Sequence, residues 1–171
     1  MATHRVSVLG HSTIPDTSGN VYPDTYSSEG VNDFFRHLCF TFLQGTTKDS
    51  LYGSFSVPEN FDSAASLVII WTANDLTQND VVWDFEYRCV GGDDAESLDE
   101  EDEQESDLTV TDAGPSAVHE RMVATIPLTS VNFSAGDTVE FIFSRDGTPG
   151  TDDDLANPAI LFDLLFEFDD A

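Results

Sequence analysis

The stretch Val81–Val90, VVWDFEYRCV, alternates apolar and polar side chains from Trp83 to Cys89. Successive side chains of a β-strand point to opposite faces, so this period of two predicts a strand with one buried and one solvent-facing side. The predicted buried face carries Val81, Trp83, Phe85, Tyr87 and Cys89, and the opposite face carries Val82, Asp84, Glu86 and Arg88.

The same pattern recurs on both sides of this stretch and predicts a chain made of strands. Residues 31–38 form the one candidate helix, which either makes about two turns or joins the strand that follows it. We expect an all-β fold, an antiparallel two-sheet sandwich of about eight strands, similar to a jelly roll. The other predicted strands cover residues 5–9, 39–43, 51–57, 66–71, 108–111, 118–128, 139–144 and 160–169.

The chain length of 171 residues predicts one folded domain, over residues 31–171. Residues 1–30 are rich in Ser, Thr, Pro, Asp and Gly, and we expect them to form an extended N-terminal arm. Residues 91–107 hold ten acidic side chains among 17 residues and predict a solvated loop inserted between two strands.

Acidic residues dominate the composition. The chain has 33 Asp and Glu against six Lys and Arg, a formal net charge of −27, and Lys48 as its one lysine. Phosphate backbones and anionic lipid both need clustered cations, so we expect no nucleic-acid and no membrane partner. The start of the chain lacks an apolar leader, which favours a protein that stays in the cell where it is made or leaves by another route. Many acids with almost no lysine are typical of a protein adapted to concentrated salt.

Catalytic patterns are missing from the sequence. The four histidines are scattered, no nucleophile elbow or phosphate-binding glycine loop occurs, and carboxylates are too numerous for any pair to be informative. We therefore expect a protein that is not an enzyme and needs no cofactor. Cys39 and Cys89 are expected to be buried in strands, either as free thiols or bridged between the sheets.

One loop could hold a hard cation. Four carboxylates lie close to glycines in this loop, and carboxylate oxygens are ligands that Ca²⁺, Mg²⁺ or Na⁺/K⁺ accept. An acidic surface turn is the alternative explanation for the same residues. The four are Asp146, Asp152, Asp153 and Asp154.

Two longer stretches resemble a group of small β-sandwich proteins encoded by tailed viruses. The first is SLYGSFSVPENFDSAASLVIIWTANDLTQNDVVWDFEYRCV, residues 50–90, and the second is FSAGDTVEFIFSRDGTPGTDDDLANPAILFDLLFEF, residues 133–168. The resemblance implies a virion structural protein, either a capsid decoration or turret subunit or a protein at the tail. The acidity points to a halophilic, haloarchaeal host. The virion would be assembled in the host cytoplasm, where other capsid or tail proteins would be its partners.

The alternative function is a jelly-roll module that binds carbohydrate or a cell surface. Such modules usually present exposed aromatic side chains, and most aromatics of this chain fall on predicted inward faces. Tyr22, Tyr26 and Tyr52 are the exceptions.

The N-terminal arm is the predicted docking surface. Residues 1–50 hold five acids and three bases, so this part of the chain carries little net charge. Arg5, Tyr22 and Tyr26 are residue types that interfaces favour. We expect this arm to bind the particle or a neighbouring copy, with the protein present as a trimer or pentamer.

The net charge predicts a stability that depends on salt. Above roughly 1 M salt the screening length falls to about 3 Å, and repulsion among the carboxylates largely disappears. We expect cooperative thermal unfolding at such concentrations and a steep loss of melting temperature below them. Calorimetry over a salt series measures this, and a flat melting temperature would contradict adaptation to brine.

Overall fold

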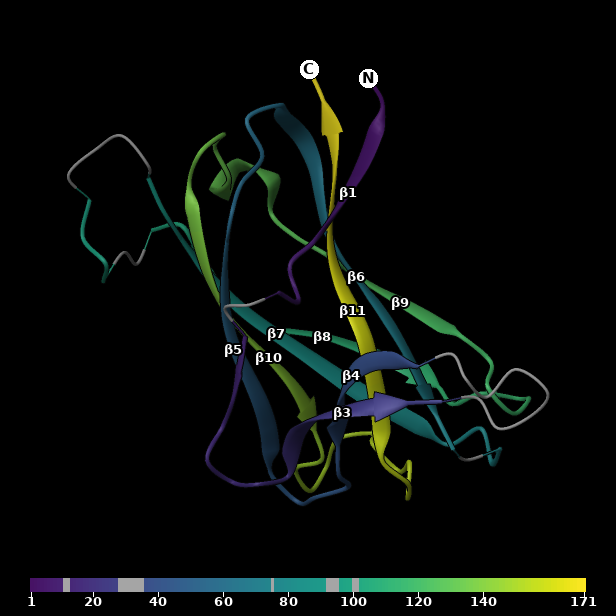
Figure 1. Cartoon of the computed structure of the whole chain (residues 1–171). Coiled ribbons are helices and arrows are strands. Elements are labelled where there is room, and N and C mark those ends of the chain that lie inside the picture. Colours follow the sequence, from purple (N-terminus) through teal and green to yellow (C-terminus); the bar gives the residue numbers. More distant parts are fainter. Residues whose placement is uncertain (11–12, 28–35, 75, 92–95, 100–101) are drawn as a thin grey trace.

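The computed structural model describes residues 1–10, 13–27, 36–74, 76–91, 96–99 and 102–171 (Figure 1). Within these ranges the chain forms strands and one short 3₁₀ turn, Ser130–Asn132. Across the same ranges, no helix has the length and apolar character needed to span a membrane. The strands are β1 (Thr3–Ser7), β2 (Ile14–Pro15), β3 (Val21–Tyr26), β4 (His37–Phe42), β5 (Lys48–Ser56), β6 (Phe61–Ala73), β7 (Asp80–Val90), β8 (Gln104–Ala113), β9 (Met122–Pro127), β10 (Thr138–Asp146) and β11 (Ala159–Asp170).

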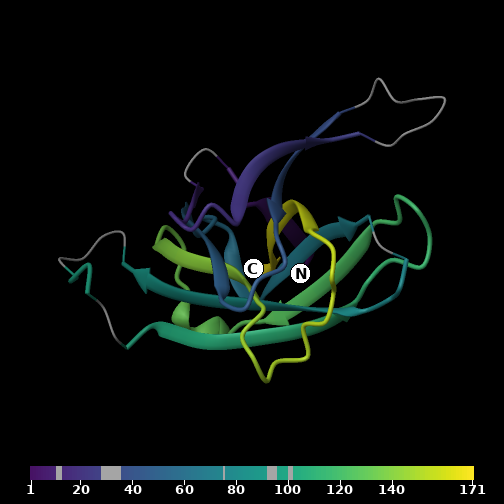
Figure 2. The same ribbon diagram turned by 90° about the horizontal axis from the view of Figure 1, so that it is seen from below.

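The strands form two antiparallel sheets that lie face to face (Figure 2). The six-stranded sheet has the order β3-β4-β11-β6-β9, and β1 pairs with the C-terminal part of β11. The five-stranded sheet has the order β2-β5-β10-β7-β8. From β4 onward, all but one of the connections cross from one sheet to the other, as in a jelly roll. The predicted two-sheet sandwich is therefore confirmed.

Aromatic side chains fill the space between the sheets. At one end Trp83 stacks on Phe143 with ring centroids 5.1 Å apart, and Phe42 and Trp71 meet Trp83 edge-on. Gly53 faces this interior, where a Cβ atom would lie 2.4 Å from the Phe141 ring, so only glycine fits there. The other end is packed by a second group of rings: Phe55, Phe61, Tyr87, Phe133, Phe141, Phe166 and Phe168.

Each of the nine predicted strands corresponds to a strand of the structure, from β1 and β4 through β11. The predicted face of β7 is also correct, since all five of its apolar residues on that face are buried. Asp84 is an exception on the other face. It points away from the core as expected, yet it is 1% exposed, because Lys48 and its neighbours cover it.

Residues 1–30 need a correction. Their described parts pair with both sheets: β1 with β11, β2 with β5, and β3 with β4. The sequence did not reveal β2 and β3, because both are edge strands and most of their side chains face solvent. An edge strand needs backbone hydrogen bonds on only one side, so it tolerates polar residues and a proline such as Pro23.

The predicted acidic insert, residues 91–107, is also longer than the loop observed. Strand β8 begins at Gln104, four residues before the predicted boundary at Leu108. Glu105 explains the difference, because its carboxylate accepts hydrogen bonds from Thr129 and Tyr87 and ties the start of β8 to the sandwich. Most of the candidate helix at residues 31–38 lies outside the described residues, and Leu38 belongs to β4.

The packing predicts that replacing two aromatic side chains by alanine lowers the free energy of unfolding by unequal amounts. Trp83 is fully buried, so Trp83→Ala should lower the free energy of unfolding by about 3–5 kcal/mol. Tyr52 lies on the outer face of β5 with 46% of its surface exposed, and Tyr52→Ala should cost about 1 kcal/mol or less. Denaturant titration in high salt compares the two. A larger loss for Tyr52→Ala would contradict the assigned faces.

Candidate functional site

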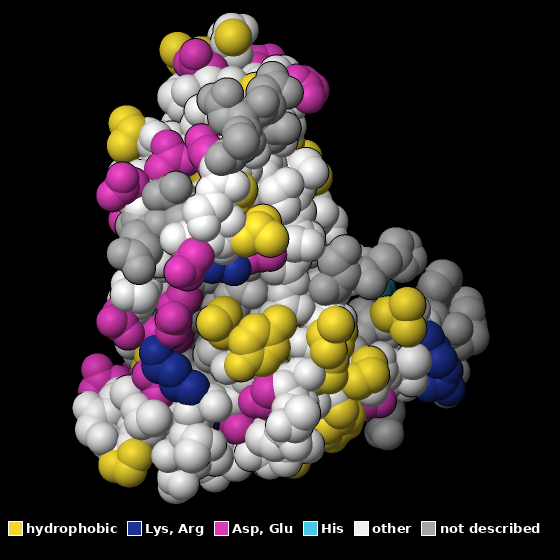
Figure 3. All heavy atoms as spheres, turned by 90° about the vertical axis from the view of Figure 1, so that its left-hand side faces the viewer, with side chains coloured by type: hydrophobic (Ala, Val, Ile, Leu, Met, Phe, Trp, Pro, Cys, Tyr) yellow, Lys and Arg dark blue, Asp and Glu magenta, His cyan; other side chains and the backbone are white. Residues whose placement is uncertain are grey.

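A hollow of about 520 Å³ lies on the outer face of the five-stranded sheet. Residues from β2, β5, β10, β7 and β8 line it, so it crosses the strands rather than following one of them. Figure 3 looks onto this face, where hydrophobic side chains lie beside a hollow bordered by acidic and basic ones. We call this hollow the sheet groove.

An apolar row forms one side of the sheet groove. Strand register places Ile14 beside Tyr52, and Tyr52 beside Ile142. Ile14 is 66% exposed and Tyr52 is 46% exposed, so both apolar side chains face solvent outside the core. Three adjacent strands therefore present a continuous apolar strip to solvent, which the hydrophobic effect favours covering with a ligand.

A polar row runs beside the apolar one. Register places Ser54 beside Glu140, Glu140 beside Arg88, and Arg88 beside Gln104. Arg88 donates to the Glu140 carboxylate through Nε at 2.7 Å, and its Nη2 lies 2.6 Å from the same oxygen. This pairing orients the guanidinium through Nε and Nη2, while Nη1 lies 3.9 Å from the exposed Asp99 carboxylate.

A β-bulge shapes the β8 side of the sheet groove. Phe85 pairs with Leu108 but Tyr87 pairs with Glu105, so β8 has an extra residue at this point. Asp107 in the bulge has a φ of 57°. Burial raises the pKa of Glu105, but hydrogen bonds from Thr129 and Tyr87 outweigh that effect and leave the pKa below its ordinary value.

Lys48 lies on the same outer face of the five-stranded sheet and pairs with three acidic side chains. Its Nζ lies 3.0 Å from the buried Asp84 carboxylate and 3.5 Å from both Glu86 and Asp107. Burial raises the pKa of Asp84, and the Lys48 ammonium offsets part of that rise. Burial alone would lower the pKa of Lys48, but the bond and charge of Asp84 outweigh it and raise the pKa. The sole lysine therefore links three strands of this sheet, β5, β7 and the β8 bulge.

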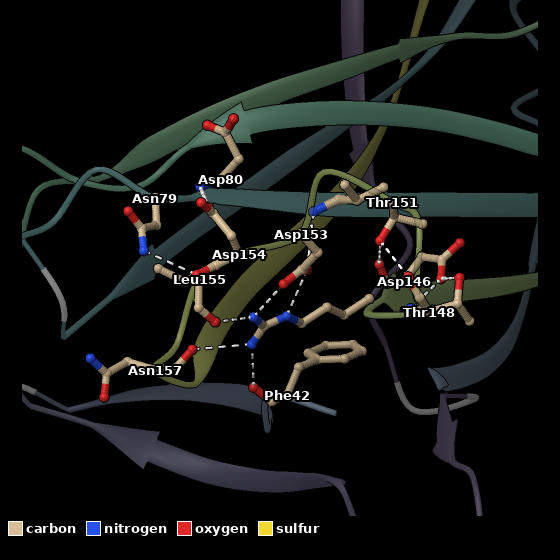
Figure 4. Close-up of polar contacts among 12 residues, drawn as sticks. Phe42, Asn79, Asp80, Asp146, Thr148, Thr151, Asp153, Asp154, Leu155 and Asn157 are labelled. Atoms are coloured by element: carbon tan, nitrogen blue, oxygen red, sulfur yellow. Dashed lines mark hydrogen bonds and ion pairs between the residues drawn. The ribbon is translucent and has the colours of Figure 1, made fainter. Parts of the chain in front are cut away.

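The loop predicted to hold a cation uses its carboxylates in another way (Figure 4). Asp146 accepts hydrogen bonds from the backbone and hydroxyl of Thr148, and Asp154 accepts one from the Asp80 backbone. Asp152 is exposed. Among the described residues, no group of three or more His, Cys, Asp and Glu is placed to hold a metal ion. The cation site stays a prediction that this geometry does not favour.

Asp153 belongs to a buried cluster around Arg145 (Figure 4). Both side chains are 1% exposed, and the two carboxylate oxygens accept from Arg145 Nε at 2.9 Å and Nη2 at 2.7 Å. The guanidinium also donates to the backbone carbonyls of Phe42, Leu155 and Asn157. Arg145 therefore joins the end of β10 to β4 and to the segment that leads into β11.

The three predicted interface residues lie apart from the sheet groove. Arg5 in β1 pairs with Glu167 of β11 at 2.5 Å. Tyr22 in β3 is 38% exposed, and Tyr26 in the same strand contacts His119 and Phe162. All three belong to the six-stranded sheet, and their role in docking stays a prediction. Cys39 and Cys89 are both buried and unbridged.

Several groove residues escaped the sequence analysis. Alternation placed Arg88 on an outward face, but its pairing with Glu140 depends on the register of β7 against β10, which no local pattern reveals. Ile14 was part of the supposed arm. Tyr52 is the groove residue that the sequence did single out, as one of three tyrosines outside the predicted inward faces.

Comparison with known proteins relates this chain to others by fold. No family model matches it, and no curated protein does. An isomalto-dextranase of Arthrobacter globiformis T6, solved with panose, gives a TM-score of 0.54 at 12% identity over 96% of this chain, which spans only 23% of that one. The K1 cleaved adhesin domain of Lys-gingipain from Porphyromonas gingivalis W83 gives 0.52 at 12% identity over 99% of both chains.

These likenesses establish a shared β-sandwich fold and nothing finer. A family 35 carbohydrate-binding module from Cellvibrio japonicus Abf62 reaches a TM-score of 0.49 at 9% identity, over 99% of this chain and 95% of that one. The comparisons lend no support to a place in a virus particle or to a halophilic host, so both stay predictions.

The Arg145 cluster predicts a large cost for losing its cation. Arg145→Met leaves the buried Asp153 carboxylate without its partner, which should lower the free energy of unfolding by about 3–5 kcal/mol. The exposed Arg121 supplies a matched control, and Arg121→Met should change stability by no more than about 0.5 kcal/mol.

A second substitution separates charge from packing. Replacing both members of the pair, Arg145→Met with Asp153→Leu, removes the orphaned charge and should restore part of the lost stability. Chemical denaturation at one salt concentration compares the variants. A double variant less stable than Arg145→Met alone would show that the unpaired carboxylate is not the main cost.

Proposed function

We propose that this chain is a carbohydrate-binding module without catalytic activity, and that it holds a sugar chain in the sheet groove. The observation that carries the proposal is the exposed apolar row Ile14–Tyr52–Ile142 beside the polar row of Glu140, Arg88 and Gln104. A pyranose ring has one face of C–H groups and a rim of hydroxyls. The two rows match these two sides.

The apolar row supports stacking. Tyr52 offers an amphipathic ring in the middle of the row, and an isoleucine on each side extends the flat surface across neighbouring strands. A rigid aromatic side chain supplies contact area at low entropic cost, which suits a weakly hydrophobic ligand such as a sugar. A hollow of about 520 Å³ is within the range of small-ligand sites.

The polar row supports recognition of hydroxyl groups. Arg88 provides donors, the carboxylates of Glu86 and Glu140 provide acceptors, and Gln104 provides both. Because Arg88 is already paired with Glu140, its orientation is set before any ligand arrives. A preorganised site loses less entropy on binding.

The state of Glu105 favours binding over hydrolysis. A glycosidase needs a carboxylic acid whose pKa is raised so that it can protonate the leaving oxygen. The pKa of Glu105 is shifted the opposite way by its bonds to Thr129 and Tyr87. Glu140 is engaged by Arg88 in a charge-assisted pair. These groove carboxylates are therefore suited to accept hydrogen bonds from hydroxyls.

The fold is compatible with the proposal without establishing it. Two structures with TM-scores above 0.5 come from an enzyme solved with the sugar panose and from an adhesin domain. At 12% identity these likenesses show the architecture alone, so the argument depends on the groove residues.

The proposal predicts that Tyr52 dominates sugar affinity. Neutral malto-, cello- and xylo-oligosaccharides are titrated into the full chain by calorimetry, at a salt concentration where it is folded. At least one series should bind, and Tyr52→Ala should weaken that binding about tenfold or more, equivalent to about 1.4 kcal/mol.

Tyr22→Ala is the matched control, because Tyr22 is a similarly exposed tyrosine on the other sheet. It should leave the affinity unchanged. Binding by none of the three series, or an equal loss in both variants, would exclude the sheet groove as a neutral-sugar site.

A further inference from the structure

A second hollow, of about 430 Å³, lies on the outer face of the six-stranded sheet, on the opposite side of the sandwich from the sheet groove. Its lining comes from β3, β4 and the start of β11, and from the turn at residues 115–121. In Figure 1 the β3–β4 pair extends from the lower middle of the molecule toward the right, where this turn lies. We call this hollow the hairpin pocket.

The wall formed by the turn is firmly built. The Glu120 carboxylate accepts hydrogen bonds from the backbone and hydroxyl of Ser116 at 2.6 and 2.9 Å, and from the Ala117 backbone at 3.1 Å. The buried Thr72 of β6 donates to the Glu120 carbonyl at 2.6 Å. The turn is thereby anchored to the sheet, and it holds His119 at a φ of 64°. Non-glycine residues in this strained conformation are concentrated at functional sites.

Tyr26 and His119 form one aromatic side of the hairpin pocket. The Tyr26 hydroxyl and His119 Nδ1 share a hydrogen bond although the two residues are 93 positions apart. The Tyr26 ring also meets Phe162 edge-on, with centroids 5.3 Å apart. Contacts on both sides fix the phenol ring, so the pocket has a rigid aromatic surface.

The charge of the hairpin pocket selects the kind of ligand. Among the described lining residues, Asp24 is the one carboxylate, and none is a lysine or arginine. Asp24 Oδ1 accepts from the Thr25 backbone at 2.7 Å, whereas Oδ2 has only a long contact of 3.4 Å to Thr41. A carboxylate with one oxygen so weakly engaged can accept from a cation, and the net charge of −27 disfavours an anion.

The remaining polar groups select hydroxyls. The hydroxyl of Thr41 and the amide of Asn74 lie among the lining residues, together with the phenol of Tyr26. Such groups bind a polyhydroxylated molecule rather than a plain alkyl amine. We propose that the hairpin pocket binds a protonated amino sugar, with the ammonium group on Asp24 and the ring against Tyr26. This site is separate from the sheet groove and does not depend on the function proposed for it.

The test compares three sugars that differ at one substituent. Glucosamine, titrated below the pKa of its amino group, should bind the full chain at least tenfold more tightly than glucose or N-acetylglucosamine. Asp24→Asn should abolish this preference, because it removes the charge and keeps the shape. Asp62→Asn makes the same change in net charge at an exposed position of β6 and should leave the preference intact.

Nuclear magnetic resonance on the unmodified chain locates the site without any substitution. Glucosamine should shift the amide signals of Asp24, Tyr26 and His119. Equal affinity for the three sugars, shifts confined to other residues, or an unaltered preference in Asp24→Asn would each overturn the proposal. Tyr52→Ala should leave glucosamine binding unchanged, because Tyr52 lines the sheet groove and not the hairpin pocket. The two proposed sites are therefore tested separately.

Discussion

The buried guanidinium of Arg145 adds a cluster of hydrogen bonds between the two sheets at one end of the apolar core. It lies at the end of β10, the central strand of the five-stranded sheet, and its bonds reach a carbonyl at the end of β4 in the other sheet. Asp153 balances its charge and orders the segment that leads into β11. A buried cation is stable only when its charge is paired and its N–H groups are satisfied, and both conditions are met here.

Because the chain has few basic side chains, the position of each one indicates where positive charge stabilises the fold. The chain has six Lys and Arg, and four of them pair with acids within the described residues: Arg5, Lys48, Arg88 and Arg145. Three of these pairs involve the five-stranded sheet. Arg5, Lys48 and Arg88 each link strands within one sheet. Arg145 links β10 to β4 in the other sheet. Many other acids of the described residues are exposed to solvent, where concentrated salt would screen their repulsion, whereas Asp49 and Asp146 are buried.

The sandwich architecture exposes two outer faces, and the structure gives them different character. The five-stranded sheet carries an exposed apolar row next to a paired arginine, which suits an extended, neutral ligand. The six-stranded sheet carries a smaller hollow, whose described lining holds a single carboxylate and a fixed tyrosine, which suits a compact ligand with positive charge. Because an aromatic core holds the sheets rigidly apart, the two faces can bind independently.

Period-two alternation, together with the continuous apolar run at residues 66–71, was enough to predict the class of fold and nine of the strands, because a sheet face that covers a core must be apolar. The inward face of β7, including Cys89, follows from the same rule. Edge strands β2 and β3 carried no such pattern, since solvent surrounds most of their side chains. The sequence also pointed to Tyr52, but not to its neighbours. Ile14, Ile142, Arg88 and Glu140 become one site only through the register of four strands, and Tyr26 meets His119 only through folding across 93 residues. Such contacts depend on the long-range arrangement of strands and turns, which the alternation within a single strand does not reveal.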